Sequence, residues 1–213
     1  MLRVSGLDAR IGPVPILHEV GLSLEDGEMC GLIGRNGAGK TTFMRALMGL
    51  VPASGRVELG DLDLMAVPPH RRPHLGLGYM PEDRRLVPDF TVEENLMLPA
   101  WSMGVENARG RLDWIFSLMP EIERFRLARA NQLSGGQQKM VALGRALMAG
   151  TRLLLLDEPF EGLAPALARR LAQVLSDLKQ EGVSVLLAES NETHVADLLD
   201  RVFHIERGRV NAR

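Results

Sequence analysis

A glycine-rich stretch, GRNGAGKTT at residues 34–42, constrains the fold of this 213-residue chain more than any other feature. It follows EMCGLIG at 28–34, an apolar run of strand length, and precedes KTTFMRALMGL at 40–50, which has helical periodicity. Glycines in such a turn let successive backbone N–H groups point at one anion, and the helix N-terminus adds partial positive charge. The order strand, glycine turn and helix therefore predicts a phosphate-binding loop. The alternative is a plain glycine-rich turn with an exposed lysine.

The loop fits the pattern G-x-x-x-x-G-K-[ST] at Gly34, Gly39, Lys40 and Thr41. We expect the Lys40 ammonium to reach the β- and γ-phosphates of a nucleotide and the Thr41 hydroxyl to ligate Mg²⁺. The side chains of Arg35 and Asn36 are interpreted as ordinary loop residues. The residues predicted to hold the nucleotide in this loop are Gly34, Asn36, Gly37, Ala38, Gly39, Lys40, Thr41 and Thr42.

Two adjacent acids follow another buried strand. The stretch LLLLDEP at 153–159 is a leucine run that ends in Asp157 and Glu158, and ligands of open parallel sheets sit outside the carboxyl ends of the strands. If this strand lies beside the strand leading to Gly34, Asp157 faces the Mg²⁺ and holds it directly or through water. Glu158 then lies where it can orient and deprotonate the water that attacks the γ-phosphate. The alternative is a polar strand end that runs into a proline turn.

Strand and helix patterns alternate in the rest of the chain. Apolar runs of strand length occupy 75–81, 152–157, 183–189 and 201–208, and helical patterns occupy 164–182 and 192–200. This alternation predicts an α/β fold, namely a P-loop (RecA-like) sheet that is mostly parallel and has helices on both faces.

Two regions depart from this alternation. The first sixty residues have strand patterns at 16–24 and 55–64, which predict an antiparallel β sub-domain near the N-terminus. The middle has helical patterns at 91–101, 108–119, 121–128 and 135–150. We therefore predict two parts: an inserted α-helical sub-domain at 84–149 and an ATP-binding α/β core made of 1–83 and 150–213.

Composition excludes several classes of protein. The net charge is −2, so no global field favours nucleic acid or lipid headgroups, and we predict no nucleic-acid partner. Cys30 is the only cysteine, which rules out an internal disulfide and favours a reducing compartment. No run approaches the roughly 18 apolar residues of a membrane span, and the first residues do not resemble a signal peptide. We expect a soluble protein that meets a membrane only through a partner.

The stretch LSGGQ at 133–137 is a second candidate for contact with phosphate. Ser134 and Gln137 have the S-x-x-Q spacing of a capping box, which alone explains a helix start. Two glycines are unnecessary for a cap and weaken the first turn. They are useful where a ligand approaches the bare backbone, so Ser134, Gly135 and Gly136 are predicted to present a hydroxyl and amides to an anion.

The motifs GRNGAGKTT, LSGGQ and LLLLDEP, in this order, resemble those of the nucleotide-binding subunit of an ABC transporter, and the resemblance covers essentially the whole chain. It implies an ATP hydrolase that uses ATP and Mg²⁺. In that family two ATPase subunits pair head to tail, so Ser134, Gly135, Gly136 and Gln137 would complete the other subunit's site. The resemblance also implies docking of 84–149 on two integral membrane permease subunits, an indirect role for a substrate-binding protein, and a peripheral location at the cytoplasmic face of the inner membrane.

Four departures from the family pattern are informative. Glu82, in YMPEDRR, stands where the family usually has glutamine, and EGLAP at 161–165 replaces the usual Ser-Ala-Leu-Asp. Ser190 replaces a histidine that senses the γ-phosphate, and Ile11 stands where an aromatic usually stacks on adenine. The Pro-Glu loop, GLAP and TVEENL at 91–96 resemble one sub-group, the second ATPase subunit of branched-chain (hydrophobic) amino-acid importers and their urea- and amide-importer relatives.

These departures predict a weakened site. The Glu82 carboxylate can take a water or an edge of the Mg²⁺ shell, but it adds negative charge near the phosphates. Ser190 donates a hydrogen bond without the positive charge of histidine, and loss of one such stabiliser typically costs on the order of 10²–10³-fold in rate. Ile11 lacks the aromatic stacking contribution of roughly 1 kcal/mol. We predict that this site is the weaker of two in a heterodimer, with a homodimer as the alternative.

Two rival functions stay open from the sequence. Mechanical ABC ATPases of DNA repair or translation carry a long coiled coil or two such modules, and this chain has neither. A regulatory partner that binds ATP without hydrolysing it is disfavoured by Glu158 but favoured by Ser190 and Ile11. His194 is a candidate displaced switch or, more simply, a partly exposed helix residue. Hydrophobic amino acids are favoured as cargo by resemblance only, with urea or short amides next.

Overall fold

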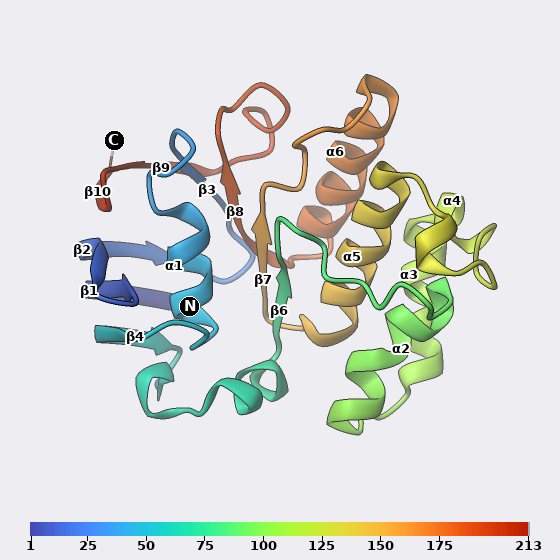
Figure 1. The fold of residues 1–213 in the computed structure, drawn as a ribbon, viewed down its shortest axis with the longest axis horizontal. Coiled ribbons are helices and arrows are strands. Elements are labelled where there is room, and N and C mark those ends of the chain that lie inside the picture. Colours follow the sequence, from blue (N-terminus) through green and yellow to red (C-terminus); the bar gives the residue numbers. More distant parts are fainter. Residues whose placement is uncertain (213) are drawn as a thin grey trace.

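The computed structural model describes residues 1–212 and contains two β-sheets with helices packed between and beside them (Figure 1). The strands of the first sheet are β1 (Leu2–Ile11), β2 (Val14–Leu24), β4 (Ala53–Leu59) and β5 (Leu62–Asp63). The strands of the second sheet are β3 (Met29–Ile33), β6 (Leu77–Met80), β7 (Leu153–Asp157), β8 (Ser184–Glu189), β9 (Arg201–Glu206) and β10 (Arg209–Ala212).

The first sheet is antiparallel, in the order β2-β1-β4-β5, and this confirms the predicted antiparallel part near the N-terminus. Its strands alternate between buried and exposed residues, as expected for a sheet with one face on the core. The expected single strand at 55–64 is wrong in detail. Gly60 takes a left-handed φ of 62° and turns the chain, so β4 and β5 form a hairpin instead.

The second sheet has the order β10-β9-β3-β8-β7-β6, and its pairs are parallel except for the β9–β10 hairpin. This confirms the predicted mostly parallel sheet. The strand of the two acids, β7, does not lie beside β3, the strand that leads to Gly34, because β8 lies between them. The strand of the two acids therefore does not pair with the strand of the glycine loop, and the two motifs meet by a different route.

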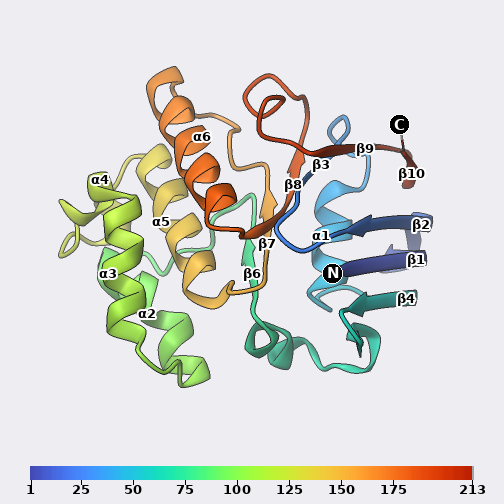
Figure 2. The ribbon, with the colours of Figure 1, turned by 180° about the vertical axis from the view of Figure 1, so that it is seen from behind.

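The helices lie on both faces of the parallel sheet. They are α1 (Lys40–Leu47), α2 (Val92–Met103), α3 (Ala108–Leu118), α4 (Pro120–Glu123), α5 (Gly135–Ala149) and α6 (Pro165–Gln180), with short 3₁₀ helices at Leu64–Ala66, Pro69–Leu75 and Ala130–Gln132. In the view of Figure 1 and from behind in Figure 2, α1 lies between the two sheets, and α5 and α6 cover the opposite face of the parallel sheet.

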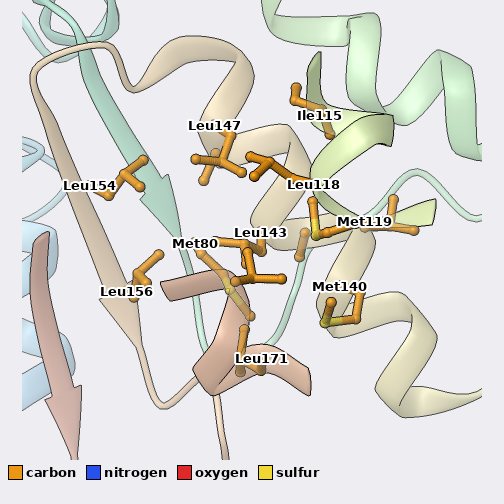
Figure 3. Packing of buried hydrophobic residues seen from close by; sticks show 14 of the residues in the cluster. Met80, Ile115, Leu118, Met119, Met140, Leu143, Leu147, Leu154, Leu156 and Leu171 are labelled. Carbon is orange, nitrogen blue, oxygen red and sulfur yellow. The ribbon is translucent and has the colours of Figure 1, made fainter. Parts of the chain in front are cut away.

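The four leucines of β7 explain why this strand is apolar throughout. Leu153 and Leu155 pack in the core shared with α1 and the antiparallel sheet, whereas Leu154 and Leu156 pack in the core shared with the other helices. Figure 3 shows Leu154 and Leu156 beside Met80, facing Leu143 and Leu147 of α5. A strand buried on both faces needs no polar alternation, so its acids can appear only at its carboxyl end.

The middle of the chain is helical, and its helices α2 to α5 share one hydrophobic core with the sheet. Helix α5 belongs to the predicted insertion at 84–149, yet it packs on β6 and β7. The division into 84–149 and a core of 1–83 plus 150–213 remains a prediction. In the described residues no helix is both long and apolar enough to span a bilayer.

One predicted helix, at 192–200, does not form, and another, at 121–128, is shorter than predicted. Residues 192–200 form turns, with bonds such as Val195 N–H to Glu192 C=O and Leu198 N–H to Val195 C=O. Only Val195 of this stretch is fully buried, while Leu198 and Leu199 are partly buried against the core. Such limited packing does little to stabilise so short a helix. The pattern at 121–128 is helical only as α4 and continues in turns.

Candidate functional site

The glycine loop joins the end of β3 to the start of α1 and needs glycine for two reasons. A side chain at Gly34 would clash with the Ile205 carbonyl oxygen, because an added Cβ would lie 2.3 Å from it. Gly39 precedes α1 with φ 114°, a left-handed value that other residues rarely adopt. No side chain caps the N-terminus of α1. Its free backbone N–H groups are therefore available to an anion.

A cleft of about 490 Å³ lies beside this loop and collects most of the predicted nucleotide contacts. Its lining residues are Ile11, Ile16, Asn36, Gly37, Gly39, Lys40, Thr41, Thr42, Arg45, Glu82 and Glu158. Ile11 is half exposed and lies with Ile16 on the wall, where both offer apolar contact. The tertiary structure thus brings together residues from β1, the glycine loop, the Glu82 loop and the end of β7.

Lys40 is almost fully buried and folds back over the loop. Its Nζ donates to the Gly34 carbonyl at 2.6 Å and the Arg35 carbonyl at 3.3 Å, and it lies 2.9 Å from Glu158 Oε1. A buried ion pair of this kind is held by its hydrogen bonds, and removing one partner is costly. The ammonium is positioned at the loop where it can exchange these oxygens for those of a phosphate.

Asp157 reaches the glycine loop even though β8 separates β7 from β3. Thr41 Oγ1 donates to Asp157 Oδ1 at 3.1 Å, and Tyr79 Oη donates to Asp157 Oδ2 at 3.4 Å. Helix α1 packs on the face of the parallel sheet against β8 and β7, and this packing brings its first turn to Asp157 at the carboxyl end of β7. Burial raises the pKa of Asp157 to about 6, and the charges of Glu82 and Glu158 add to that rise. A cation held between the hydroxyl and this carboxylate would offset the cost of burying the charge.

Glu158 is buried and adopts a left-handed φ of 49°. Its carboxylate pairs with Lys40 and accepts from Ser190 Oγ at 3.4 Å, and the same hydroxyl donates to Asn36 Oδ1 at 2.8 Å. The structure therefore brings Ser190, Asn36 and Glu158 together. A non-glycine residue with positive φ is uncommon, and such strain clusters at functional sites.

Glu82 also lines the cleft and is exposed. Carboxylate oxygens of Glu82, Glu158 and Glu161 approach one another within 4.8 Å. This concentration of negative charge adjoins the glycine loop, as expected for Glu82 from the sequence. Glu161, in the EGLAP stretch, belongs to this group although its sequence context gave it no role.

The 134–137 loop lies away from these groups. Ser134 Oγ accepts from the Gln137 N–H at 3.3 Å, and Gln137 Oε1 accepts from the Ser134 N–H at 2.8 Å, so the capping box is present. Ser134 and Gly135 are exposed, and none of the four residues lines the cleft described above. An added Cβ on Gly136 would lie 2.3 Å from Leu167 Cδ2, so packing against α6 also favours glycine there.

Comparisons with known proteins identify the family. The model of the family described as "ABC transporter" matches residues 17–161. This chain belongs to the ABC transporter family. It is an ABC-type ATPase, and like other members it binds nucleotide.

Curated relatives of this ABC ATPase span nearly its whole length. It is 36% identical to the high-affinity branched-chain amino acid transport ATP-binding protein BraG of Pseudomonas aeruginosa, over 99% of this chain and 91% of that protein. It is 33% identical to the probable branched-chain amino acid transport ATP-binding protein LivF of Archaeoglobus fulgidus, over 99% and 90%. It is 32% identical to the lipopolysaccharide export system ATP-binding protein LptB of Escherichia coli, over 92% and 83%.

Solved structures give the same result. The ADP conformation of an ATP-binding cassette of an ABC transporter is 27% identical and superposes with a TM-score of 0.83, over 100% of this chain and 89% of that chain. A dimeric bacterial ABC transporter cassette is 25% identical with a TM-score of 0.87, over 99% and 97%. These values confirm the predicted fold class over the full length of the ABC ATPase.

His194 is exposed and stacks on Phe160, with ring centroids 5.5 Å apart. Both rings line a second cavity of about 630 Å³, which shares Asn36 and Glu158 with the cleft and includes Ser190. Ser190, and not His194, makes the hydrogen bond to Glu158 in this ABC ATPase. The structure therefore gives no direct contact for His194 as a displaced switch.

Sequence reasoning missed three charged residues near the site. Lys139 donates to the Glu158 carbonyl at 2.6 Å, and Glu189 accepts from the Phe160 N–H at 2.9 Å. Arg145 donates to the carbonyls of Arg84 and Arg85, next to Glu82 in sequence. Lys139 and Arg145 lie in the otherwise apolar run KMVALGRALM and Glu189 ends the apolar strand SVLLAE. A charged residue inside an apolar helix or strand could have indicated these positions, because such charges are rarely buried without a partner.

Proposed function

We propose that this ABC ATPase binds MgATP in the cleft beside residues 34–42 and hydrolyses it to power an importer of branched-chain or other hydrophobic amino acids. The observation that carries the hydrolytic part is the contact of Thr41 with Asp157 at 3.1 Å beside the buried pair of Lys40 and Glu158. A hydroxyl, two carboxylates and a lysine at a glycine loop match the needs of phosphoryl transfer, which depends on positioning and charge neutralisation.

The residues proposed to hold Mg²⁺ are Thr41 and Asp157, with Glu82 at the edge of its shell. Hydroxyl and carboxylate oxygens are the donors that Mg²⁺ prefers, and the two donors already lie in contact. When bound, the ion would neutralise charge that develops on the phosphates. Asp157 carries a raised pKa of about 6, so it is ionised at neutral pH and available as a ligand.

The remaining residues of the site are proposed to bind the phosphates, accept the proton of the attacking water and contact the base. Lys40 releases the Gly34 carbonyl and pairs with the phosphates, while the N–H groups from Gly37 to Thr42 surround them. Glu158, freed from Lys40, accepts a proton from the attacking water. Ser190, whose single hydroxyl hydrogen lies near Asn36 and Glu158 in the free protein, turns that hydrogen toward the γ-phosphate when nucleotide binds. Ile11 contacts the adenine base.

The 134–137 loop is proposed to act on the nucleotide of a second ATPase subunit. Support comes from its exposure and its absence from the cleft of its own chain, and from a solved cassette that is described as dimeric. We propose a heterodimer, with two integral membrane permease subunits and, indirectly, a substrate-binding protein. The chain would then lie peripherally at the cytoplasmic face of the inner membrane.

The amino-acid cargo is supported by the names of BraG and LivF, at 36% and 33% identity. The similarity to LptB, at 32%, favours a second candidate, an ATPase of an export system. Co-purification of the membrane subunits with the tagged chain, followed by reconstitution in vesicles, separates the two. Uptake of leucine driven by ATP supports import. ATP hydrolysis coupled only to extraction of a lipid from the vesicle supports export.

Replacement of Glu158 by Gln tests whether the site is catalytic. Turnover should fall about 10²- to 10⁴-fold, the usual contribution of a general base, and an ATP-bound dimer should accumulate on size-exclusion chromatography with MgATP. A regulatory subunit that only binds ATP should be unchanged in both measurements.

Fluorescent-ATP titration of the purified chain tests the weaker-site proposal. With Ser190 and Ile11 in place, the isolated chain should bind MgATP and turn over slowly. Replacement of Ser190 by His should raise the turnover, because a histidine adds positive charge near the transition state. Full family-like turnover of the unmodified chain alone would contradict the proposed asymmetry.

A further inference from the structure

The turn that follows Glu158 is held by two charged side chains from separate elements. Lys139, on α5, donates from Nζ to the Glu158 carbonyl oxygen at 2.6 Å. Glu189, at the end of β8, accepts the Phe160 N–H at Oε1 at 2.9 Å. Each bond involves a backbone group of the short segment from Glu158 to Phe160. The proposed catalytic role of Glu158 uses neither of them.

Both charged residues are buried at a cost. Lys139 is 8% exposed and Glu189 is 6% exposed. Burial lowers the pKa of Lys139, and the nearby carboxylates of Glu161, Glu189 and Glu158 oppose that shift. Burial raises the pKa of Glu189 to about 7. Charged groups are retained in such surroundings where they are hydrogen-bonded and near an opposite charge, and each is bonded to this turn.

The turn itself needs support. Glu158 has a left-handed φ of 49°, which is unfavourable for a residue with a side chain and persists only where the surroundings determine it. Its carboxylate must also leave Lys40 and face a water when nucleotide binds. A backbone held at both ends of the segment keeps the carboxylate in place during that exchange.

We propose that Lys139 and Glu189 are positioning residues that clamp the backbone from Glu158 to Phe160 and so hold the Glu158 carboxylate in its working orientation. Lys139 lies one turn inside α5, whose N-terminus is the 134–137 loop. The clamp therefore ties the carboxylate of one nucleotide site to the helix that carries the loop for another subunit's site. This inference rests on the proposed role of Glu158 as base.

Paired substitutions at each position test the clamp. Lys139→Met and Glu189→Leu remove the hydrogen bond, whereas Lys139→Gln and Glu189→Gln keep a donor and an acceptor, respectively. The purified chain, with its partner subunit where one co-purifies, is assayed for kcat and KM. We expect kcat to fall about 10- to 100-fold in Lys139→Met and Glu189→Leu, with KM changed less than about 3-fold, because geometry and not nucleotide binding is lost. The glutamine variants should regain most of kcat.

Lys179→Met is the matched control. Lys179 Nζ also donates to a backbone carbonyl, that of Leu198, at 2.6 Å, and it pairs with Asp200 away from the cleft. It should leave kcat within about 2-fold. If Lys139→Met lowers kcat no more than Lys179→Met, or raises KM by the same factor as it lowers kcat, the clamp is refuted.

Hydrogen exchange gives a readout that does not depend on turnover. In the metal-free protein the peptide that contains the Phe160 amide should exchange at least about 10-fold faster in Lys139→Met and Glu189→Leu, with peptides of β3 unchanged. Unchanged exchange of that peptide would overturn the clamp. Wild-type protein that binds no MgATP and shows no turnover would instead refute the proposed function, so the two failures are distinguishable.

Discussion

Two helices of this protein begin with glycines and a hydroxyl residue, but their N-termini are built differently. The first, at the start of α1, has no side-chain cap, and it opens on a cleft with Lys40 buried beside it. The second, at the start of α5, is closed by its own capping box of Ser134 and Gln137 and is largely exposed. One helix end leaves its N–H groups for a ligand, and the other satisfies part of them internally.

The difference also extends to charge. The first N-terminus is backed by buried ionisable groups, Lys40, Asp157 and Glu158, which hydrogen-bond or pair with each other or with the loop. The residues at 134–137 are all neutral. An anion can therefore be held by the first site within one chain, whereas the second site offers dipoles and needs a charge supplied elsewhere. Two similar sequence signals thus give two helix N-termini with different surroundings, and only the first has buried charged side chains beside it.

The largest expected effect is a loss of MgATP binding when the lysine beside the first helix N-terminus is removed. Replacement of Lys40 by Met should weaken MgATP binding on the order of 10²-fold, since a hydrogen bond to a charged group contributes roughly 1.5–3 kcal/mol. Titration with fluorescent ATP measures it. Because Glu158 would lose its cation, the double variant Lys40→Met/Glu158→Gln is the control that removes both charges. Equal binding by wild type and both variants would remove the distinction between the two helix ends.

Alanine substitutions compare how much protein stability depends on one glycine at each of the two helix N-termini. Gly39→Ala should destabilise the protein by about 1–3 kcal/mol, because φ is 114° and the new Cβ would lie 2.9 Å from Leu17 Cδ2. Gly136→Ala should cost less, because the atom it meets belongs to the movable Leu167 side chain and alanine favours a helix by about 1 kcal/mol. Urea unfolding measures both. A larger loss at Gly136 would show that α5 and α6 pack more rigidly than the nucleotide loop.

A smaller effect is expected from Ser134→Ala. Loss of an N-cap hydroxyl typically costs about 1 kcal/mol of stability, and MgATP binding by the isolated chain should stay within about 2-fold. Turnover of the assembled dimer should fall, because the loop is proposed to serve the other subunit. A loss of binding in the isolated chain comparable to that of Lys40→Met would place both loops at one site.

The last effect depends on pH and concerns the buried charges behind the first loop. Glu189 has a pKa of about 7 in the folded protein, raised by burial from 4.5. Between these pH values the folded state holds a proton that the unfolded chain has released, so this group's contribution to stability declines as pH rises from 4.5 to 7. Glu189→Gln should flatten that decline by up to about 1.4 kcal/mol per pH unit. Urea midpoints at pH 5, 6, 7 and 8 measure it, with exposed Glu206→Gln as control; parallel curves would contradict the shift.

Much of the fold followed from local patterns. The alternation of apolar runs and helices predicted the parallel sheet and the helices on both faces, because burial on two faces requires apolar strands such as β7. The stretch at 192–200 misled, because its apolar residues have helical spacing while the tertiary structure buries only Val195 fully. Spacing alone does not say whether a partner surface exists for the stripe.

The residues that meet at the candidate site were selected from motifs, but their arrangement was only partly predicted. Lys40, Thr41, Asp157 and Glu158 were identified from motifs, yet the reason that Thr41 meets Asp157 was not, because strand order was unknown. Lys139, Glu189 and Arg145 were missed. Each acts on a backbone carbonyl or N–H distant in sequence, and no spacing rule connects such partners.

The sequence by itself determined which groups are available: glycines for a turn that leaves N–H groups free, a lysine at the helix start, acids at the end of a buried strand, and the family to which these belong. Only the tertiary structure decided which of them meet. Strand order placed β8 between the two motifs, and the packing of α1 against β8 and β7 brought Thr41 to Asp157. The physical reason is that local propensity acts within a few residues, whereas contacts between distant groups depend on how whole elements bury their apolar faces.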